Sequence, residues 1–296
     1  MSLPFTADLA MRPNVQGFYD EATSALSYVV RDPASTACAV IDPVLDIDYA
    51  AGHISHQSAD HIIDYVKENG LTVEWLIETH VHADHISAAH YIREKIGGRI
   101  GIGHNVTKVQ AIFADIFNET DGFKRDGSQF DHLFQDGESY RIGTLTGHTM
   151  DTPGHTPACM THVIGDAAFV ADTLFMPDGG TARADFRGGG ARALYRSIQR
   201  ILELPDAARV FVCHDYKPNG REPRWETSVG EQRRTNIHLA SNPSEDEFVA
   251  MREARDATLP MPRLILPSLQ INMRAGTMPP PDKDGRIFLK VPINTL

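Results

Sequence analysis

The sequence predicts an α/β fold in which two sheets are faced by helices. Short β-branched and aromatic runs open the chain, strands and helices then alternate, and a second succession of strands followed by helices comes after them. This two-fold pattern is the first observation. The second is length, because 296 residues suffice for a substantial core, in one large domain or two small ones.

The first half is predicted to begin as a strand meander and to continue as alternating strands and helices. Turn residues such as Asp42-Pro separate the strands, and Asn69-Gly supplies a helix stop. The expected strands are Val15–Tyr19, Ala25–Val30, Ala37–Ile41, 71–78 and Arg99–Ile102. The expected helices are Ser58–Glu68, 86–96 and Thr107–Phe117.

The second half follows a polar, Gly- and Asp-rich stretch at 118–137. Together with the helix before it, this stretch makes 104–137 an expected excursion from the main sheet. The expected strands are Ser139–Ile142, Thr144–Met150, Ala158–Ile164, Ala167–Ala171 and Arg209–Cys213. The expected helices are Ala191–Leu202, 228–240 and 244–257.

Composition argues against several classes of function. The formal net charge of −11 disfavours nucleic acid as a partner. No apolar run approaches the length of a membrane span, and the N-terminus has no secretory signal pattern. Three scattered cysteines, Cys38, Cys159 and Cys213, are too few for a disulfide framework and indicate a reducing compartment. We therefore expect a cytoplasmic protein without membrane or nucleic-acid contacts.

Residues 79–85 read Thr-His-Val-His-Ala-Asp-His and follow the apolar strand expected at 71–78. His80, His82 and Asp84 share one parity, so an extended segment presents them on one face, and His85 comes next. Imidazole and carboxylate are ligands of borderline divalent metals such as zinc and iron. This density of metal-capable side chains predicts a metal site rather than a loop of solvated histidines.

Further ligand-type residues come after other apolar strands. His155 lies on a Pro-Gly turn, and Asp172 and His214 each end a strand. Any one of them alone is typical of a cap or turn residue, but together with the histidine loop they predict convergence on one sheet edge. The other histidines lack this placement and are expected to be ordinary surface or core residues: His53, His56, His61, His90, His104, His132, His148, His162 and His238.

In order and spacing these residues resemble the metallo-β-lactamase superfamily over residues 15 to about 220. The resemblance implies a four-layer αβ/βα sandwich of two mixed sheets flanked by helices, with metal at one edge. It also implies a single domain over 1–296. Its core would be about 15–220, with the excursion at 104–137 and a C-terminal extension at 221–296.

Within the superfamily, three segments are similar to the persulfide dioxygenases, which are related to the glyoxalase II thioesterases. These segments are the histidine loop, Ala-Arg-Ala-Asp-Phe at 182–186 and His-Asp-Tyr at 214–216. Residues 225–233 resemble a bacterial subgroup labelled β-lactamase-like hydrolase and linked to hydrogen sulfide detoxification.

The ligand-type residues alone leave the number of metals open. One metal held by His80, His155 and Asp172 is the two-histidine, one-carboxylate triad associated with non-haem Fe(II) and O₂. Two metals would form a clamp suited to hydrolysing a thioester, lactone or amide. That clamp would divide the ligands into His80, His82, His155 and Asp84, His85, His214, bridged by Asp172.

The resemblance to the dioxygenases favours one Fe(II) per chain over one or two zinc ions in a glyoxalase II-like hydrolase. It implies that iron is held by His80, His155 and Asp172. The other four candidates then orient the ligands and the substrate: His82, Asp84, His85 and His214.

The resemblance also implies a reaction and partners. In that family glutathione persulfide and O₂ are converted to sulfite and glutathione. Arg183 and Tyr216 match positions that contact the glutathione moiety, and a guanidinium suits a carboxylate. The alternatives are a surface salt bridge for Arg183 and a packed aromatic side chain for Tyr216. A homodimer is one candidate assembly, and a sulfurtransferase that supplies the persulfide is one candidate partner. Because the excursion and the extension lie where substrate would be shaped, another low-molecular-weight persulfide is the alternative to glutathione persulfide.

Overall fold

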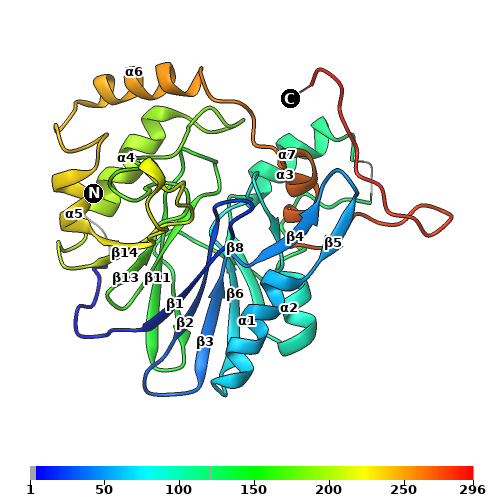
Figure 1. The fold of residues 1–296 in the computed structure, drawn as a ribbon, viewed down its shortest axis with the longest axis horizontal. Coiled ribbons are helices and arrows are strands. Elements are labelled where there is room, and N and C mark those ends of the chain that lie inside the picture. The colour runs from blue at the N-terminus through cyan, green and yellow to red at the C-terminus, as the bar shows by residue number, and fades with distance from the viewer. Residues whose placement is uncertain (1–4, 120–121, 296) are drawn as a thin grey trace.

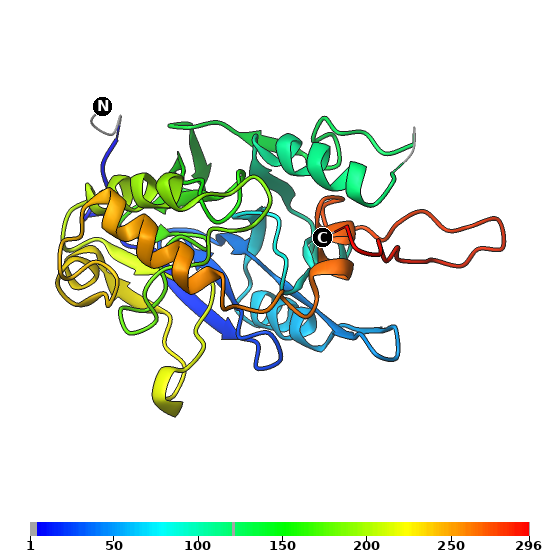
Figure 2. The same ribbon diagram turned by 90° about the horizontal axis from the view of Figure 1, so that it is seen from above.

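The computed structural model describes residues 5–119 and 122–295 and shows two sheets with helices on their outer faces (Figures 1 and 2). The strand order is β1-β2-β3-β6-β8-β9 in the first six-stranded sheet and β10-β11-β12-β13-β14-β15 in the second. A small third sheet has the order β5-β4-β7. The α/β fold expected from the sequence is confirmed.

The strands and helices of the first half have the following bounds. The strands are β1 (Asn14–Tyr19), β2 (Leu26–Arg31), β3 (Ala37–Ile41), β4 (Val44–Asp48), β5 (His53–Ser55), β6 (Thr72–Glu78), β7 (Ile86–Ser87), β8 (Arg99–Gly103) and β9 (His132–Phe134). The helices are α1 (Gln57–Glu68), α2 (Ala89–Ile96) and α3 (Val106–Ile116).

The second half has a shorter succession of strands and more helices. The strands are β10 (Ser139–Ile142), β11 (Leu145–Asp151), β12 (Met160–Ile164), β13 (Ala167–Phe169), β14 (Arg209–Phe211) and β15 (Glu226–Ser228). The helices are α4 (Ala191–Leu202), a 3₁₀ turn at Pro218–Gly220, α5 (Val229–Thr235), α6 (Glu245–Asp256) and α7 (Ile265–Asn272).

Alternation of side chains along the strands produces the layers. In β2, Val29 joins a buried cluster with residues of α1 and α2, whereas Tyr28 and Val30 join a cluster with residues of the second sheet. A third cluster lies between the second sheet and α4, α5 and α6, and it includes Leu194 and Phe248. Three apolar layers between four structural layers give the αβ/βα sandwich.

The structure corrects three expectations about individual elements. The helix expected at 86–96 begins only at Ala89, because Ile86 and Ser87 pair with β4. The helix expected at 228–240 is shorter, since α5 ends at Thr235. The excursion at 104–137 returns to the sheet at its end, where β9 pairs in parallel with β8.

Helix α7 was not expected because its sequence carries little helix signal. It has no side-chain cap, Pro267 lies in its first turn, and its residues from Pro267 to Asn272 are all buried. A helix buried on all sides lacks the amphipathic period that identifies surface helices. Across the described residues, no helix combines the length and apolar character that a membrane crossing needs.

The sheet topology brings several strand ends to one edge. Strands β3, β6 and β8 are parallel, as are β13 and β14 in the second sheet. The two sheets meet where these strands end, because Met160 N at the start of β12 donates to Thr79 O after β6 at 3.0 Å. The loops that follow β6, β13 and β14 therefore open at a common edge.

Candidate metal centre

Three side chains from three loops converge at this edge. His80 follows β6, His155 follows β11 and Asp172 follows β13. Each offers one ligand atom, and these atoms lie within 4.8 Å of one another. His155 Nε2 is 3.6 Å from Asp172 Oδ2, and the rings of His80 and His155 are nearly perpendicular at 5.4 Å. All three side chains are buried.

A glycine allows His155 to reach this position. Gly154 has φ +148°, and a Cβ atom there would lie 2.3 Å from the Cα atom of Leu194 in α4. Only glycine fits so close to another backbone. The Pro-Gly turn noted in the sequence therefore presses the His155 loop against α4.

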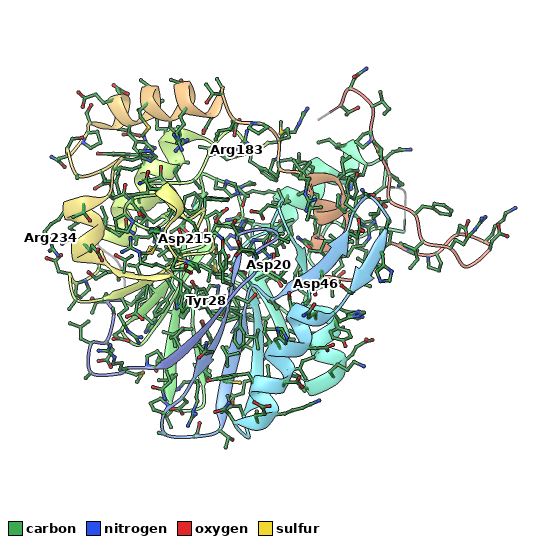
Figure 3. The ribbon with its side chains drawn as sticks, viewed as in Figure 1. Asp20, Tyr28, Asp46, Arg183, Asp215 and Arg234 are labelled. Atoms are coloured by element: carbon green, nitrogen blue, oxygen red, sulfur yellow. The ribbon has the colours of Figure 1, made fainter. Side chains whose placement is uncertain are left out.

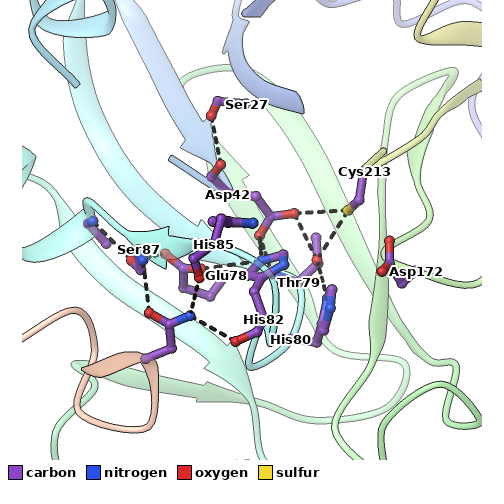
Figure 4. A network of polar contacts seen from close by, with 12 residues as sticks. Ser27, Asp42, Glu78, Thr79, His80, His82, His85, Ser87, Asp172 and Cys213 are labelled. Atoms are coloured by element: carbon purple, nitrogen blue, oxygen red, sulfur yellow. Dashed lines mark hydrogen bonds and ion pairs between the residues drawn. The ribbon is translucent and has the colours of Figure 1, made fainter. Parts of the chain in front are cut away.

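Hydrogen bonds fix which nitrogen of each imidazole faces the centre. Thr79 Oγ1 donates to Asp42 Oδ2 at 2.8 Å and lies 3.1 Å from His80 Nδ1, so it accepts the Nδ1 proton (Figure 4). His155 Nδ1 donates to the carbonyl of Arg183 at 2.9 Å. Both Nε2 atoms therefore carry lone pairs directed at the centre, as ligand histidines require.

These donors fit a divalent metal ion. His80 Nε2 is buried and has no hydrogen-bond partner among the described residues. Burial, followed by the nearby imidazole of His82, lowers the pKa of His80 well below its ordinary value, so His80 is neutral. Two neutral imidazoles and a carboxylate form the donor set of a facial triad with open coordination positions.

His82 does not join this triad. Its Nε2 donates to Asp42 Oδ1 at 3.0 Å and lies 3.5 Å from Glu78 Oε2. Its ligand atoms instead group with those of Asp84 and His85. The sequence placed His80 and His82 on one face of an extended segment. In the structure, His80 joins the centre, whereas His82 forms a buried ion pair with Asp42.

His214 lies between two carboxylates. Its Nδ1 donates to Asp172 Oδ1 at 2.8 Å, and its Nε2 is 2.7 Å from Asp84 Oδ2. Although burial opposes the charged ring, Asp172 and Asp84 raise the pKa of His214 well above its ordinary value. Asp84, Asp172 and His214 also form a compact ligand group of their own, so Asp172 belongs to both groups.

Asn272, which the sequence did not single out, anchors the histidine loop of residues 79–85 from the C-terminal extension. We call this loop the metal loop. Its Nδ2 donates to the carbonyls of His82 and His85 at 2.9 and 2.8 Å. Its Oδ1 accepts from Ser87 N at 2.8 Å. No local pattern identifies such a residue, since it lies 190 positions from His82 and its helix was not expected.

A cavity of about 480 Å³ opens onto the centre. His155, Asp172 and Asp84 line its floor, and the segment from α6 to α7 lines one wall. Tyr216 lines it too, stacked on His214 at 5.8 Å with an interplanar angle of 5°. This cavity joins the centre to the outside.

Arg183 lines the same cavity, but its guanidinium is already engaged. It donates from Nε and Nη2 to both oxygens of Asp185 at 2.6 and 2.8 Å, and from Nη1 to Pro260 O at 2.6 Å. Figure 3 shows Arg183 close to the segment that connects α6 with α7. Its observed contacts hold the cavity wall and use three of the five N–H donors of the guanidinium.

Two arginines of that wall, Arg255 and Arg263, are exposed and line the cavity. Neither has an ion-pair partner among residues 5–119 and 122–295. Sequence reasoning missed these two arginines because the segment carries no motif. Their positive charges stand out in a chain with a formal net charge of −11.

Comparison with known proteins gives a consistent family. Residues 21–214 match the family model described as the metallo-beta-lactamase superfamily. The chain is 54% identical over 284 residues to the "Beta-lactamase hydrolase-like protein" of Xylella fastidiosa (strain Temecula1 / ATCC 700964), with 96% of this chain covered. It spans only 65% of that relative's length.

Two further relatives carry different names. "Glyoxylase B2" of Dictyostelium discoideum is 43% identical over 97% of this chain and 99% of its own length. "Persulfide dioxygenase ETHE1, mitochondrial" of Bos taurus is 30% identical, with 89% of each chain covered. The crystal structure of ETHE1 from Myxococcus xanthus matches with a TM-score of 0.71 and 29% identity, over 89% of this chain and 100% of that one.

The variant Asn272→Leu tests the fastening of the metal loop. It removes both donors to the loop and leaves the carbonyls of His82 and His85 unpaired. We expect metal affinity to fall by about tenfold or less, because the loop that carries His80 loses two anchoring hydrogen bonds while the three ligand side chains remain. Competition with a chromophoric chelator measures this change.

Gln270→Leu is the matched control, because Gln270 is buried on the same helix and donates to Leu266 O and Lys290 O, away from the loop. It should lower thermal stability and leave metal affinity unchanged. Equal loss of affinity in both variants would show that Asn272 acts only through general stability.

Proposed function

The chain belongs to the metallo-β-lactamase superfamily, and within it we propose that it is a mononuclear non-haem Fe(II) persulfide dioxygenase. The proposed reaction is RSSH + O₂ + H₂O → RSH + H₂SO₃, in which O₂ takes the four electrons that the persulfide sulfur loses. RSSH is glutathione persulfide or a similar low-molecular-weight persulfide, and the role is sulfide detoxification. We place this reaction in the cytoplasm.

One observation carries the proposal. The ligand atoms of His80, His155 and Asp172 form one compact group. The other four candidates occur only in other groups: His82, Asp84, His85 and His214. His82 is bonded to Asp42 and His214 to two carboxylates. A persulfide dioxygenase among the relatives supports the same function.

The chain's own residues supply orientation and charge around the iron. Bound Fe(II) would supply the one-electron chemistry through which O₂ reacts with a closed-shell persulfide. The charged His214 holds Asp172 by Oδ1 and leaves Oδ2 directed at the centre. Tyr216, stacked on His214, forms the cavity wall that the substrate passes.

A dinuclear zinc hydrolase of a glutathione thioester is the second candidate. Asp172 belongs both to the His80 group and to the group with Asp84 and His214, which is the position of a bridging ligand. The similarity to a protein named glyoxylase B2 also favours this candidate.

The opening of the cavity, where the thiol carrier of the persulfide would lie, has both apolar and cationic side chains. Leu259 and Met261 are exposed there beside Arg255 and Arg263. In a chain that is acidic overall, two guanidinium groups without an ion-pair partner in the described part of the chain favour an anionic substrate. Glutathione has such carboxylates, and so do other small anionic thiols.

Metal content and O₂ uptake separate the two candidates. Protein from iron-supplemented cells should hold about one iron per chain and consume O₂ when glutathione persulfide is added. His80→Ala should lose the iron, because it removes a ligand. His214→Ala should retain iron and turn over more slowly, because it removes only an orienting group.

A protein that holds two zinc ions per chain, cleaves a glutathione thioester and takes up no O₂ would contradict the dioxygenase proposal. Loss of metal on changing His214 would favour the dinuclear site, since His214 is then a ligand.

The double variant Arg255→Gln/Arg263→Gln tests the anionic substrate. Two exposed ion pairs of ordinary strength correspond to a rise in KM for glutathione persulfide of about tenfold. The KM for a small uncharged persulfide, such as that of 2-mercaptoethanol, should stay the same. Steady-state O₂ uptake measures both values.

Arg234→Gln is the charge-matched control, because Arg234 is exposed on α5, far from the cavity (Figure 3). Its KM for glutathione persulfide should equal that of the unchanged protein. An unchanged KM in the double variant would contradict binding of the substrate by these arginines.

A further inference from the structure

A second, smaller cavity of about 40 Å³ borders His155. Its lining is mainly apolar and is contributed by Ala83, Phe113, Phe186, Met261, Pro262 and Ile265. The two cavities adjoin each other beside the candidate metal centre, because both are lined by Ala83, His155, Arg183, Met261 and Pro262. We call this smaller space the side cavity.

Three charged residues border the side cavity, and Asp185 and Arg183 pair with each other. Asp185 accepts both bonds from Arg183, and Arg187 donates to Thr295 O at 2.6 Å. His155 Nδ1 is bonded to the Arg183 carbonyl. The rest of the lining is apolar, and because a buried water molecule needs roughly two to four polar partners, the apolar part of this space favours an apolar occupant.

The size of the side cavity restricts its occupant to a very small apolar molecule. Its volume is less than a tenth of that of the large cavity, which leaves no room for a thiol carrier. Empty apolar cavities in proteins take up apolar molecules and xenon. O₂ is a small apolar molecule, and it is a substrate of the proposed reaction.

We propose that the side cavity holds O₂ beside the metal centre, while the persulfide enters through the large cavity. The assignment of O₂ rests on the proposed dioxygenase function. The capacity to hold a small apolar gas rests only on the lining residues.

Segments distant in sequence build the side cavity together. Phe113 comes from α3, Phe186 follows the Arg183 wall, and Ile265 begins α7. The ring of Phe186 lies 5.8 Å from that of His155 and 5.2 Å from that of Phe113. The 104–137 segment and the C-terminal extension thus add apolar walls to the metal edge of the sandwich.

If O₂ and the persulfide occupy different cavities, a variant can change the KM for O₂ without changing the KM for the persulfide. Filling the side cavity should hinder O₂ without obstructing the persulfide. Ile265→Phe adds volume at its wall, and Phe113→Trp does so from α3, in case the first variant fails to fold. Leu266→Phe is the matched control, since Leu266 is the next residue of α7 and does not line the cavity.

Crystals of the iron-loaded protein pressurised with xenon provide the direct test. We expect a xenon atom against Phe113, Phe186 and Ile265 in the unchanged protein and in Leu266→Phe, and none in Ile265→Phe or Phe113→Trp. In O₂-uptake assays, the filled variants should show a KM for O₂ raised by about fivefold or more. Their KM for glutathione persulfide should stay the same.

Absence of xenon from the side cavity of the unchanged protein would overturn the proposal. A filled variant that raises the KM for the persulfide instead would also overturn it and assign the space to the organic substrate. If xenon binds but the protein consumes no O₂ with any persulfide, the dioxygenase function fails and the O₂ assignment falls with it. The gas-binding cavity itself would remain.

Discussion

One buried carboxylate, that of Asp42, holds together the edge of the sandwich that carries the candidate metal centre. It follows β3 in a left-handed conformation with φ 48°, which aspartate tolerates better than most residues. It accepts from Thr79 N at 2.7 Å, from Thr79 Oγ1, from His82 Nε2 and from Cys213 Sγ at 3.2 Å. A buried charge is tolerated only when it is bonded this fully. The ends of β3, β6 and β14 are therefore held at one point.

This carboxylate also decides what the histidine loop can do. Through Thr79 it sets the proton of His80 on Nδ1, and by direct contact it holds His82 away from the triad. Burial works against the charge, but His82 and His80 together keep the pKa of Asp42 below its usual range. The different roles of His80 and His82 therefore depend on the buried charge of Asp42 as well as on the sequence of the loop.

The parts that sequence predicted well are those with local signals. The strands that precede His80, His155, Asp172 and His214 are apolar runs with clear ends, and parallel strands must end at one edge, so convergence could be anticipated. Asp42, by contrast, looked like a turn residue before proline. Asn272 sits in a helix with no cap and no period, and the bond from Arg183 to Pro260 joins residues 77 positions apart. Such long-range partners leave no trace in a local pattern.

The bonds from Asn272 set the order in which a nascent chain can assemble this edge. The triad residues are all synthesised by position 172, yet the carbonyls of His82 and His85 find their partner only 190 and 187 residues later. A ribosome-bound chain that has not yet released α7 holds its histidine loop unfastened. The hydrogen bonds that support this loop are therefore completed only late in biosynthesis, and a chain interrupted before α7 lacks them.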